Sequence, residues 1–297
     1  MTIPTFPQPK VSVGIPTFNR GISLIRTVES VLRQDYPHIE VIISDNASTD
    51  NTNTLCREIS IMDSRIKYVR MLRNQGPTAN FREVLALSSG DYFMWLGDDD
   101  WIDTSYVRLC LNELLENKDY SLVCGLTMYL QDGDDGFPGE IINLKGNSSI
   151  LRVIKYYATV GRNGTYYGLM RRGQISQIAL RNIMGGDWLF IAAVAFLGKI
   201  KTLPEVSIHR HLGGATHSYR KMARGLSLTK FEGRFPHLAI AAFAFKDILY
   251  GEKVFDNLKK PERLLWACLI AAFIVVWRAI LPWFVKGVRR ILRFLPR

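Results

Sequence analysis

The first hundred residues of the chain alternate short apolar runs with segments of helical spacing. The apolar runs have the length and composition of buried strands and cover residues 11–15, 40–44, 66–69 and 91–96. Between them, apolar side chains recur every three or four residues, as on one face of a helix, over 22–32, 55–62 and 78–88. This β-α-β-α-β-α-β order predicts an α/β protein with a parallel sheet, wound in Rossmann fashion and flanked by helices.

From about residue 105 the pattern mixes helices and strands. Helical spacing over 106–115 precedes an apolar run over 121–130, and an acidic, glycine-rich loop is expected over 131–140. Two further helices are predicted at 150–157 and 188–196. No internal repeat or low-complexity block is found in the sequence.

The last segment of the chain is more apolar. Residues 264–277 are 14 residues without a charge, Arg278 interrupts the run, and an apolar stretch resumes over 279–285 with Pro282 inside it. This uninterrupted run is shorter than the roughly 20 residues that span a bilayer. The pattern predicts a helix that lies in the membrane interface, or a re-entrant one, which residues 238–245 can join. The alternative is an amphipathic helix packed on the protein's own core or on another subunit.

The formal net charge is +11, and a basic protein suits nucleic acid, anionic lipid or a phosphorylated ligand. From Arg263 to the end the chain has no Asp or Glu, and its basic residues alternate with apolar runs. These basic residues are Arg263, Arg278, Lys286, Arg289, Arg290, Arg293 and Arg297. Their distribution indicates a membrane surface as partner, and no nucleic acid is expected.

The cysteines and the amino terminus indicate a compartment. The four cysteines stand at no metal-binding or disulfide spacing, which favours a reducing environment. Residues 1–10 lack the apolar run of a secretory signal, so the N-x-S/T sequons at Asn46, Asn147 and Asn163 are expected to be chance matches. We predict a location at the cytoplasmic face of the cell membrane, held peripherally or by a re-entrant C-terminal segment.

Polar loops follow three of the predicted strands, at residues 16–20, 45–50 and 97–100. Because ligands bind at the carboxyl ends of parallel strands, these loops are expected to converge on one edge of the sheet. The last loop ends in three consecutive aspartates, whose mutual repulsion a divalent cation relieves. Such oxygen ligands suit Mg²⁺ or Mn²⁺, which can bridge to a diphosphate and stabilise it as a leaving group. The alternative is a solvated acidic turn.

Three stretches together resemble the family-2 glycosyltransferases with the GT-A fold: Ile15-Pro-Thr-Phe-Asn19, Asp45-Asn-Ala-Ser-Thr-Asp50 and Gly97-Asp-Asp-Asp100. The resemblance is dense over about residues 10–105 and sparse over 180–218. It implies a Rossmann-like, mixed and mainly parallel sheet, with a C-terminal apolar and basic helical extension in this chain. It also implies a nucleotide-sugar donor and a single displacement that inverts the configuration of the sugar.

The resemblance further implies roles for single residues. Asp45 matches the carboxylate that contacts the base. Asp98 with Asp100 matches the DxD-type pair that binds metal and donor diphosphate, and Asp99 is a further candidate for a direct ligand. The predicted nucleotide-sugar contacts are Pro16, Thr17, Phe18, Asn19, Asp45, Asn74, Asp98 and Asp99, and the predicted Mg²⁺ or Mn²⁺ ligands are Asp98, Asp99, Asp100 and His211.

A later stretch, Gly185-Gly-Asp187, resembles the segment of the family that carries the catalytic base. Asp187 is then expected to deprotonate the acceptor hydroxyl while that oxygen attacks the anomeric carbon, and the alternative is a helix N-cap. His211, on an expected basic loop, stands at a family histidine that contacts metal or diphosphate. Arg210 is a candidate phosphate contact, with a solvated surface charge as the alternative.

These expectations combine in one assignment. Residues 1–235 are predicted to form a GT-A catalytic domain, with a nucleotide-binding half at 10–105 and an acceptor half at 106–235. Residues 236–297 are predicted to form a helical, membrane-associating segment. We expect a hexosyltransferase that moves a sugar from a nucleoside-diphosphate sugar to a lipid-linked saccharide in surface polysaccharide synthesis. Two alternatives stay open: a nucleotidyltransferase, although no glycine-rich phosphate loop is found, and a non-catalytic protein that binds membrane surfaces.

Overall fold

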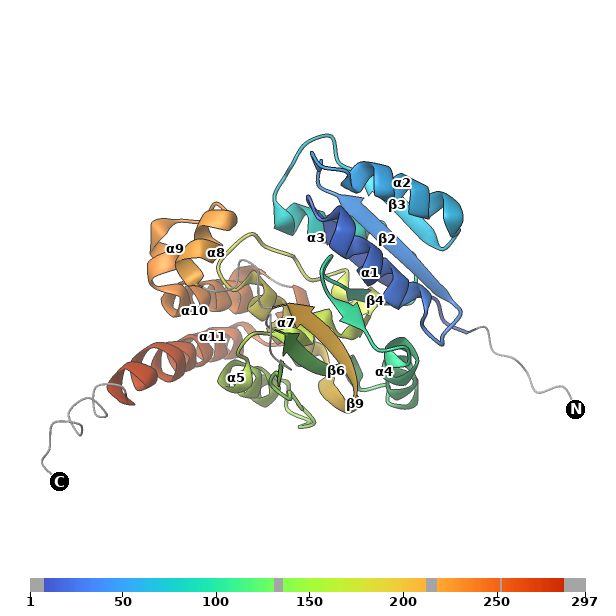
Figure 1. Cartoon of the computed structure of the whole chain (residues 1–297). Coiled ribbons are helices and arrows are strands. Elements are labelled where there is room, and N and C mark those ends of the chain that lie inside the picture. The colour runs from blue at the N-terminus through green and yellow to red at the C-terminus, as the bar shows by residue number, and fades with distance from the viewer. Residues whose placement is uncertain (1–7, 131–135, 212–217, 252, 286–297) are drawn as a thin grey trace, which may run out of the picture.

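The computed structural model describes residues 8–130, 136–211, 218–251 and 253–285. Within these ranges a nine-stranded sheet forms the centre of the molecule (Figure 1). Its strand order is β3-β2-β1-β4-β8-β6-β9-β5, and β7 pairs with β6 outside this path. Helices lie on both faces of the sheet, as the alternation of apolar runs and helical segments predicted.

The first half of the sheet is parallel and follows the predicted order of strands and helices. Its strands are β1 (Val11–Thr17), β2 (Ile39–Asp45), β3 (Ile66–Arg70) and β4 (Tyr92–Trp95), and its helices are α1 (Gly21–Leu32), α2 (Thr52–Met62) and α3 (Pro77–Ala86). β1 lies between β2 and β4, with Thr17 beside Asp45 at the carboxyl end. Side chains alternate between the two faces of a strand. Val13 and Ile15 of β1 therefore pack with α1 on one face of the sheet, and Phe93 and Trp95 of β4 point to the other face.

The second half of the sheet is mixed. β8 (Leu169–Arg171) runs antiparallel to β4 and to β6 (Tyr120–Leu130), and β6 runs parallel to β9 (Lys199–His211). The remaining strands are β5 (Trp101–Ile102) and β7 (Phe137–Pro138). The helices of this half are α4 (Tyr106–Glu116), α5 (Ser149–Thr159), η1 (Gly164–Tyr167), α6 (Arg172–Ile175), α7 (Gly186–Leu197), α8 (Tyr219–Gly225) and α9 (Lys230–Arg234).

Two loop predictions need correction in this half. The expected basic loop begins later than predicted, because His209, Arg210 and His211 are the last residues of β9, which pairs with β6 up to Leu130. Residues 212–217 lie outside the described part of the chain. The expected acidic loop over 131–140 contains the short strand β7, and its residues 131–135 are also outside the described part.

The C-terminal segment forms a longer helix than predicted. α11 (Lys260–Ile274) continues through the π-helical turn η5 (Val275–Ile280) to residue 285, which gives one helix of 26 residues, Lys260–Val285. By length and composition alone this helix could cross a membrane, because it continues past Arg278, where the uninterrupted apolar run ends. Pro282 lies in its last turns, just beyond the π-helical turn that widens the backbone.

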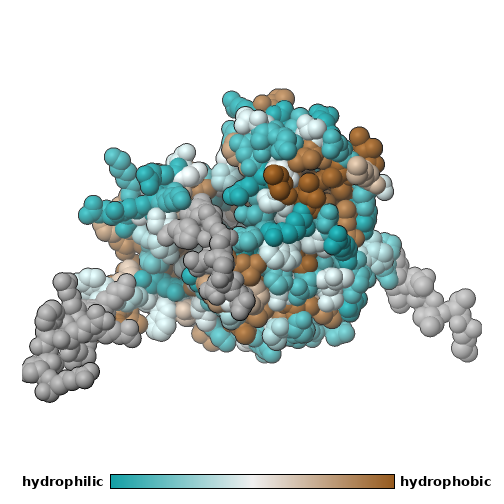
Figure 2. Space-filling view, viewed as in Figure 1, coloured by the Kyte–Doolittle hydropathy of each residue, from teal (hydrophilic) through white to brown (hydrophobic). Residues whose placement is uncertain are grey.

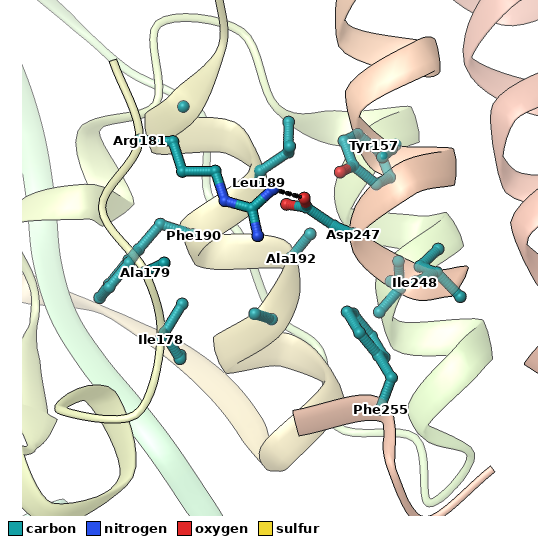
Figure 3. Close-up of a pocket in the computed structure, with 14 residues that line it drawn as sticks. Tyr157, Ile178, Ala179, Arg181, Leu189, Phe190, Ala192, Asp247, Ile248 and Phe255 are labelled. Atoms are coloured by element: carbon teal, nitrogen blue, oxygen red, sulfur yellow. Dashed lines mark hydrogen bonds and ion pairs between the residues drawn. The ribbon is translucent and has the colours of Figure 1, made fainter. Parts of the chain in front are cut away.

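One face of this helix packs on the rest of the protein. Ala267, Ile270 and Ile274 are buried in the same apolar core as α5, α7 and the preceding helix α10 (Pro236–Lys246). Arg181, ahead of α7, forms an ion pair with Asp247 in the turn η3 (Asp247–Gly251), beside a cavity of about 10 Å³ (Figure 3). That volume holds one water molecule at most. The predicted boundary at residue 236 therefore separates two segments that share a core.

Exposed apolar side chains include two groups on helices. On the C-terminal helix they include Trp277, Ile280, Leu281, Trp283 and Phe284. Apolar surface also lies over α1 and α2, where Ile22, Ile61 and Met62 are exposed (Figure 2). Exposure alone therefore does not single out the C-terminal helix.

Candidate active site: two cavities joined at Arg210

A cleft of about 920 Å³ opens at the carboxyl ends of β1 and β4. The chain winds from β1 outward to β2 and β3, and then returns to place β4 on the other side of β1. Such a reversal of strand order leaves a crevice in which ligands bind. The predicted site residues that line this cleft are Pro16, Thr17, Phe18, Asn74, Asp98, Asp99 and Asp100.

The three aspartates lie in one turn but have different partners. The Asp98 carboxylate accepts hydrogen bonds from the Thr17 hydroxyl at 2.8 Å and the Phe18 N–H at 3.4 Å. Asp99 lies 3.8 Å from the Arg20 guanidinium, and its side chain is part-exposed. Asp100 accepts a hydrogen bond from Nε of Arg210 at 2.9 Å. Of the three carboxylates, only that of Asp100 accepts a hydrogen bond from an arginine among the described residues, whereas Asp99 has a longer ion pair with Arg20.

Burial changes the acidity of this cluster. It raises the pKa of Asp98 to about 6, with the charge of Asp99 adding to the effect and the Thr17 hydrogen bond opposing it. Burial also raises the pKa of Asp100, while the charge of Arg210 acts in the opposite direction. A cation entering beside Asp98 would favour its ionised form, as the predicted metal site requires.

The donor set fits a divalent cation that is shared with a ligand. In the described ranges, no group of three His, Cys, Asp or Glu residues could hold a metal ion. Mg²⁺, however, is commonly held by one or two carboxylates together with substrate phosphates. Asp98 and Asp99 satisfy that requirement, whereas Asp100, predicted as a ligand, is paired with Arg210.

Asp45 and Asn19 lie beside the cleft and do not line it. Asp45 is fully buried, and its carboxylate accepts hydrogen bonds from the Tyr68 hydroxyl, Nε of Arg70 and the Ser48 N–H at 3.0, 3.2 and 2.8 Å. The Asn19 side chain accepts a hydrogen bond from the Thr49 N–H. Both residues thus hold the two loops in place.

Asn46 lines the cleft directly and was missed by the sequence reasoning. Its amide donates to Oδ1 of Asn74 and to the Gly76 carbonyl, at 3.0 and 3.1 Å. Asn46 thereby ties the loop after β2 to the loop after β3. Its position next to Asp45 at the end of a predicted strand was the available signal.

A second cavity, of about 660 Å³, contains Asp187 and His211. Asp187 lies in the first turn of α7, and the N-cap is Gly185, so the alternative that Asp187 is the N-cap is wrong. Gly185 has φ of 71°, and a Cβ there would lie 2.6 Å from Ile240. Glycine is therefore required for the turn that brings Asp187 to the cavity.

Asn163 holds the Asp187 carboxylate. Its amide donates to Oδ2 of Asp187 at 2.9 Å, and its carbonyl oxygen accepts from the Tyr156 hydroxyl at 2.9 Å. Burial raises the pKa of Asp187, and the hydrogen bond from Asn163 acts against that shift. A raised pKa of the Asp187 carboxyl suits a general base, because such a base works best with a pKa near the working pH. The sequence offered the Asn163-Gly164 turn signal, which was treated only as a sequon.

Arg210 lines both cavities. Its guanidinium donates a hydrogen bond to the Tyr167 hydroxyl at 3.2 Å, in addition to the one it donates to Asp100. The guanidinium carbon lies 4.1 Å from the ring centroid of Tyr167. The side chain is 17% exposed, so the alternative of a solvated surface charge is wrong. His211 follows it at the end of β9 and lies 5.6 Å from the ring of Trp101. His211 lines the second cavity and does not line the cleft of the aspartates.

Comparisons with known proteins show the family to which the chain belongs. The family model described as "Glycosyl transferase family 2" matches residues 12–174. An uncharacterized glycosyltransferase of Haemophilus influenzae is 34% identical over 268 residues, which cover 85% of this chain and 99% of that protein. The GalNAc(5)-diNAcBac-PP-undecaprenol beta-1,3-glucosyltransferase of Campylobacter jejuni is 32% identical over 128 residues. That match covers 43% of this chain and only 41% of the length of the Campylobacter protein.

Solved structures share the fold. Residues 1–349 of TarS from S. aureus align over 91% of this chain and 72% of that chain, with a TM-score of 0.62 and 17% identity. The mannosyltransferase PcManGT of Pyrobaculum calidifontis, solved with GDP-Man and Mn²⁺, covers 98% of this chain and 82% of that chain. Its TM-score is 0.57 and its identity 17%. These likenesses support the predicted mixed α/β fold with flanking helices.

Proposed function

The chain belongs to glycosyl transferase family 2, and on that premise we propose that it transfers a sugar from a nucleoside-diphosphate sugar to an acceptor hydroxyl. One observation carries the proposal: Arg210 lines two neighbouring cavities. One is the cleft with acidic side chains at the carboxyl ends of β1 and β4, and the other contains the buried carboxylate of Asp187. A transferase needs such a pair, because donor and acceptor must meet at the anomeric carbon.

The cleft at the ends of β1 and β4 is the donor site in this proposal. Asp98 and Asp99 would hold a Mg²⁺ or Mn²⁺ ion, and the bound ion supplies charge stabilisation to the departing diphosphate. Thr17 and Phe18 orient Asp98 through their hydrogen bonds. Arg20 and Arg210, which also line the cleft, provide further positive charge for the diphosphate.

The second cavity receives the acceptor. Asp187 takes the proton of the acceptor hydroxyl while that oxygen attacks the anomeric carbon. The bond from the anomeric carbon to the diphosphate oxygen breaks, and its electron pair leaves with the nucleoside diphosphate. Attack from the side opposite the leaving group inverts the configuration of the sugar. Asn163 keeps the Asp187 carboxylate oriented and favours its ionised form.

The acceptor in this proposal is a lipid-linked saccharide used in surface polysaccharide synthesis. The Campylobacter relative is named as acting on an undecaprenol-diphosphate-linked glycan. In this chain, the apolar helix Lys260–Val285 packs against α5 and exposes Trp277, Trp283 and Phe284. Tryptophan is enriched where protein meets the membrane–water interface. We place the enzyme at the cytoplasmic face of the cell membrane, with this helix as its contact.

The test uses the purified full-length chain and a panel of UDP-, GDP- and dTDP-sugars with Mg²⁺ or Mn²⁺. We expect one class of donor to bind and to be slowly hydrolysed. Asp99→Asn and Asp187→Asn should each abolish sugar transfer, whereas Asp35→Asn, which removes a surface ion pair with Arg108, should not. A protein that binds and hydrolyses none of these donors would contradict the proposal. Full activity in either active-site variant would contradict the role of that residue.

A further inference from the structure

Arg278 brings a positive charge from the C-terminal helix to the wall of the acceptor cavity. It lies in the π-helical turn η5, and its guanidinium carbon is 4.9 Å from the ring centroid of Trp188. Trp188 lines the cavity and follows Asp187 in α7. The charge that interrupts the apolar run in the sequence is therefore turned toward the acceptor site.

The guanidinium of Arg278 is only partly satisfied. Its Nε and Nη2 are buried and have no hydrogen-bond partner among the residues that the structure describes. The other buried side-chain atoms in this condition are neutral oxygens, on Ser44, Asn80, Ser121, Tyr129 and Gln174. A buried, unpaired charged donor costs more than a neutral one, so an anionic ligand at Arg278 would remove a larger penalty. The planar fork of arginine matches the oxygens of phosphate.

No carboxylate of the described ranges lies within ion-pair distance of Arg278. Glu140 acts electrostatically on it, but its carboxylate already accepts a hydrogen bond from the Arg162 N–H. Tyr219 and Tyr156 also lie close by, and burial raises the pKa of each, so both are neutral. Arg162 also lines the cavity, with its guanidinium over the rings of Tyr129 and Phe137. Among the residues that the structure describes, Arg278 and Arg162 thus have no ion pair with a carboxylate, and they belong to the wall and the lining of the acceptor cavity.

The position of Arg278 in the helix suggests what carries the anion. The preceding residue, Trp277, donates its indole N–H to the Ala158 carbonyl at 3.1 Å, which fixes this turn against α5. The neighbouring Ile280, Leu281 and Phe284 are exposed. An apolar surface therefore begins within a few residues of an unpaired cation, which itself lies beside the cavity of Asp187.

We propose that Arg278 binds a phosphate group of the lipid-linked acceptor, with the saccharide in the cavity of Asp187 and the lipid chain along the exposed apolar side of the C-terminal helix. This inference rests on the proposed function for the existence of such an acceptor. It adds the phosphate to the features that the enzyme recognises, so a phosphate-free glycoside of the same saccharide is a poorer ligand. Arg278 is a binding residue here and takes no part in proton transfer.

The experiment measures binding of farnesyl diphosphate to the full-length protein in detergent, with EDTA present so that no metal bridges the probe to the aspartates. Farnesol is the phosphate-free control ligand. Arg278→Met keeps the aliphatic contact with Trp188, and we expect it to weaken farnesyl diphosphate binding at least about tenfold while farnesol binding is unchanged. Arg278→Lys should bind with intermediate affinity. Lys260→Gln removes an exposed charge of the same helix and should bind as the unmodified protein does.

Equal affinity of Arg278→Met and the unmodified protein for farnesyl diphosphate would overturn the proposal. The proposal would also be overturned if Arg278→Met no longer bound phosphatidylglycerol vesicles but still bound farnesyl diphosphate. In that case the arginine would bind the headgroups of membrane lipids. If Arg278→Met does not fold, the affinities of Arg278→Lys and Lys260→Gln for farnesyl diphosphate are compared. Weaker binding by Arg278→Lys supports the proposal, and equal binding by the two variants overturns it. Nucleotide-sugar binding by the unmodified protein is measured separately, so a failure of the proposed transferase function is distinguishable from a failure at Arg278.

Discussion

Replacing Asn163 by glycine tests how the candidate base is controlled. Asn163 has a left-handed backbone with φ of 54°, which glycine adopts without strain, so Asn163→Gly removes the amide and leaves the turn intact. The hydrogen bond from the Asn163 amide to Asp187 is 2.9 Å long and favours the ionised carboxylate. A hydrogen bond to a charged group contributes about 1.5–3 kcal/mol. Its loss therefore disfavours the ionised form of Asp187 by about that amount.

The sign of the effect on the rate follows from the role proposed for Asp187. A general base works in its ionised form, and burial already raises its pKa. Without Asn163 the pKa rises further, so the acid limb of the pH–rate profile moves to higher pH. At a fixed pH on that limb, the loss of about 1.5–3 kcal/mol lowers the rate roughly 10- to 150-fold. At a pH well above the limb the rate recovers.

The assay is the pH dependence of kcat for sugar transfer, or for donor hydrolysis with water as the acceptor. Tyr156→Phe is the matched control, because it removes the other hydrogen bond of Asn163 and leaves the contact with Asp187 in place. Both variants are expected to lose about 1–3 kcal/mol of stability, since each leaves a buried polar group without its partner. Only Asn163→Gly should move the acid limb. An unchanged limb in that variant, or an equal shift in Tyr156→Phe, would refute the reasoning.

Three further predictions concern the donor cleft, the metal and the membrane. Arg210→Met leaves the Asp100 carboxylate buried without its partner, so we expect the free energy of unfolding in denaturant to fall by up to about 3–5 kcal/mol. Adding Asp100→Asn should restore part of that free energy, and a double variant whose loss equals the sum of the two single losses would contradict the pairing. Chelation of divalent metal should abolish nucleotide-sugar binding in calorimetry without changing the melting temperature of the free protein, and donor binding that persists in EDTA would exclude a metal bridge. The double variant Trp283→Ser, Phe284→Ser should weaken binding to anionic vesicles at least about tenfold in a flotation assay. Ile61→Ser, at an exposed apolar site on α2, should not weaken it, and equal losses of binding would mean that the C-terminal helix is not the specific membrane contact.

The nucleotide-binding half could be predicted from the sequence because its signals are local. Strands β1, β2 and β4 are buried on both faces and therefore occur as mostly apolar runs, and each is followed by a polar loop. The outer strand β3 is buried only at Ile66. Parallel order then brings the loops together without any knowledge of side-chain contacts. For this reason the sequence predicts that Asp98, Asp99 and Thr17 belong to one site, and in the structure the Thr17 hydroxyl donates to Asp98.

The acceptor half was harder to predict because its elements depend on distant contacts. β9 contains Pro204, and its register with β6 shifts between Gly125 and Leu126, so its apolar residues do not alternate regularly. β8 has three residues and exists through pairing with β4 and β6. Asn163 acts on a residue 24 positions away through a left-handed turn. No local pattern carries any of these relations.

The C-terminal helix illustrates a different limit. In the sequence Arg278 interrupts an apolar run, which resumes over 279–285, and nothing indicates which way the arginine points. In the structure the helix continues, and the arginine is turned toward Trp188 while apolar side chains stay on the outside. Which side of a helix faces the protein is set by packing with α5 and α10, and the sequence alone did not contain that information.

In the proposed transferase, the shared position of Arg210 couples the binding of the ligands in the two cavities. A diphosphate that enters the cleft competes with Asp100 for the guanidinium, and any movement of Arg210 also changes the wall that the acceptor meets. Coupling between two equilibrium binding sites is reciprocal. By whatever factor the donor changes the affinity for the acceptor, the acceptor must change the affinity for the donor by the same factor. One side chain can thus impose a preferred order of substrate addition and protect the nucleotide sugar from hydrolysis until an acceptor is in place.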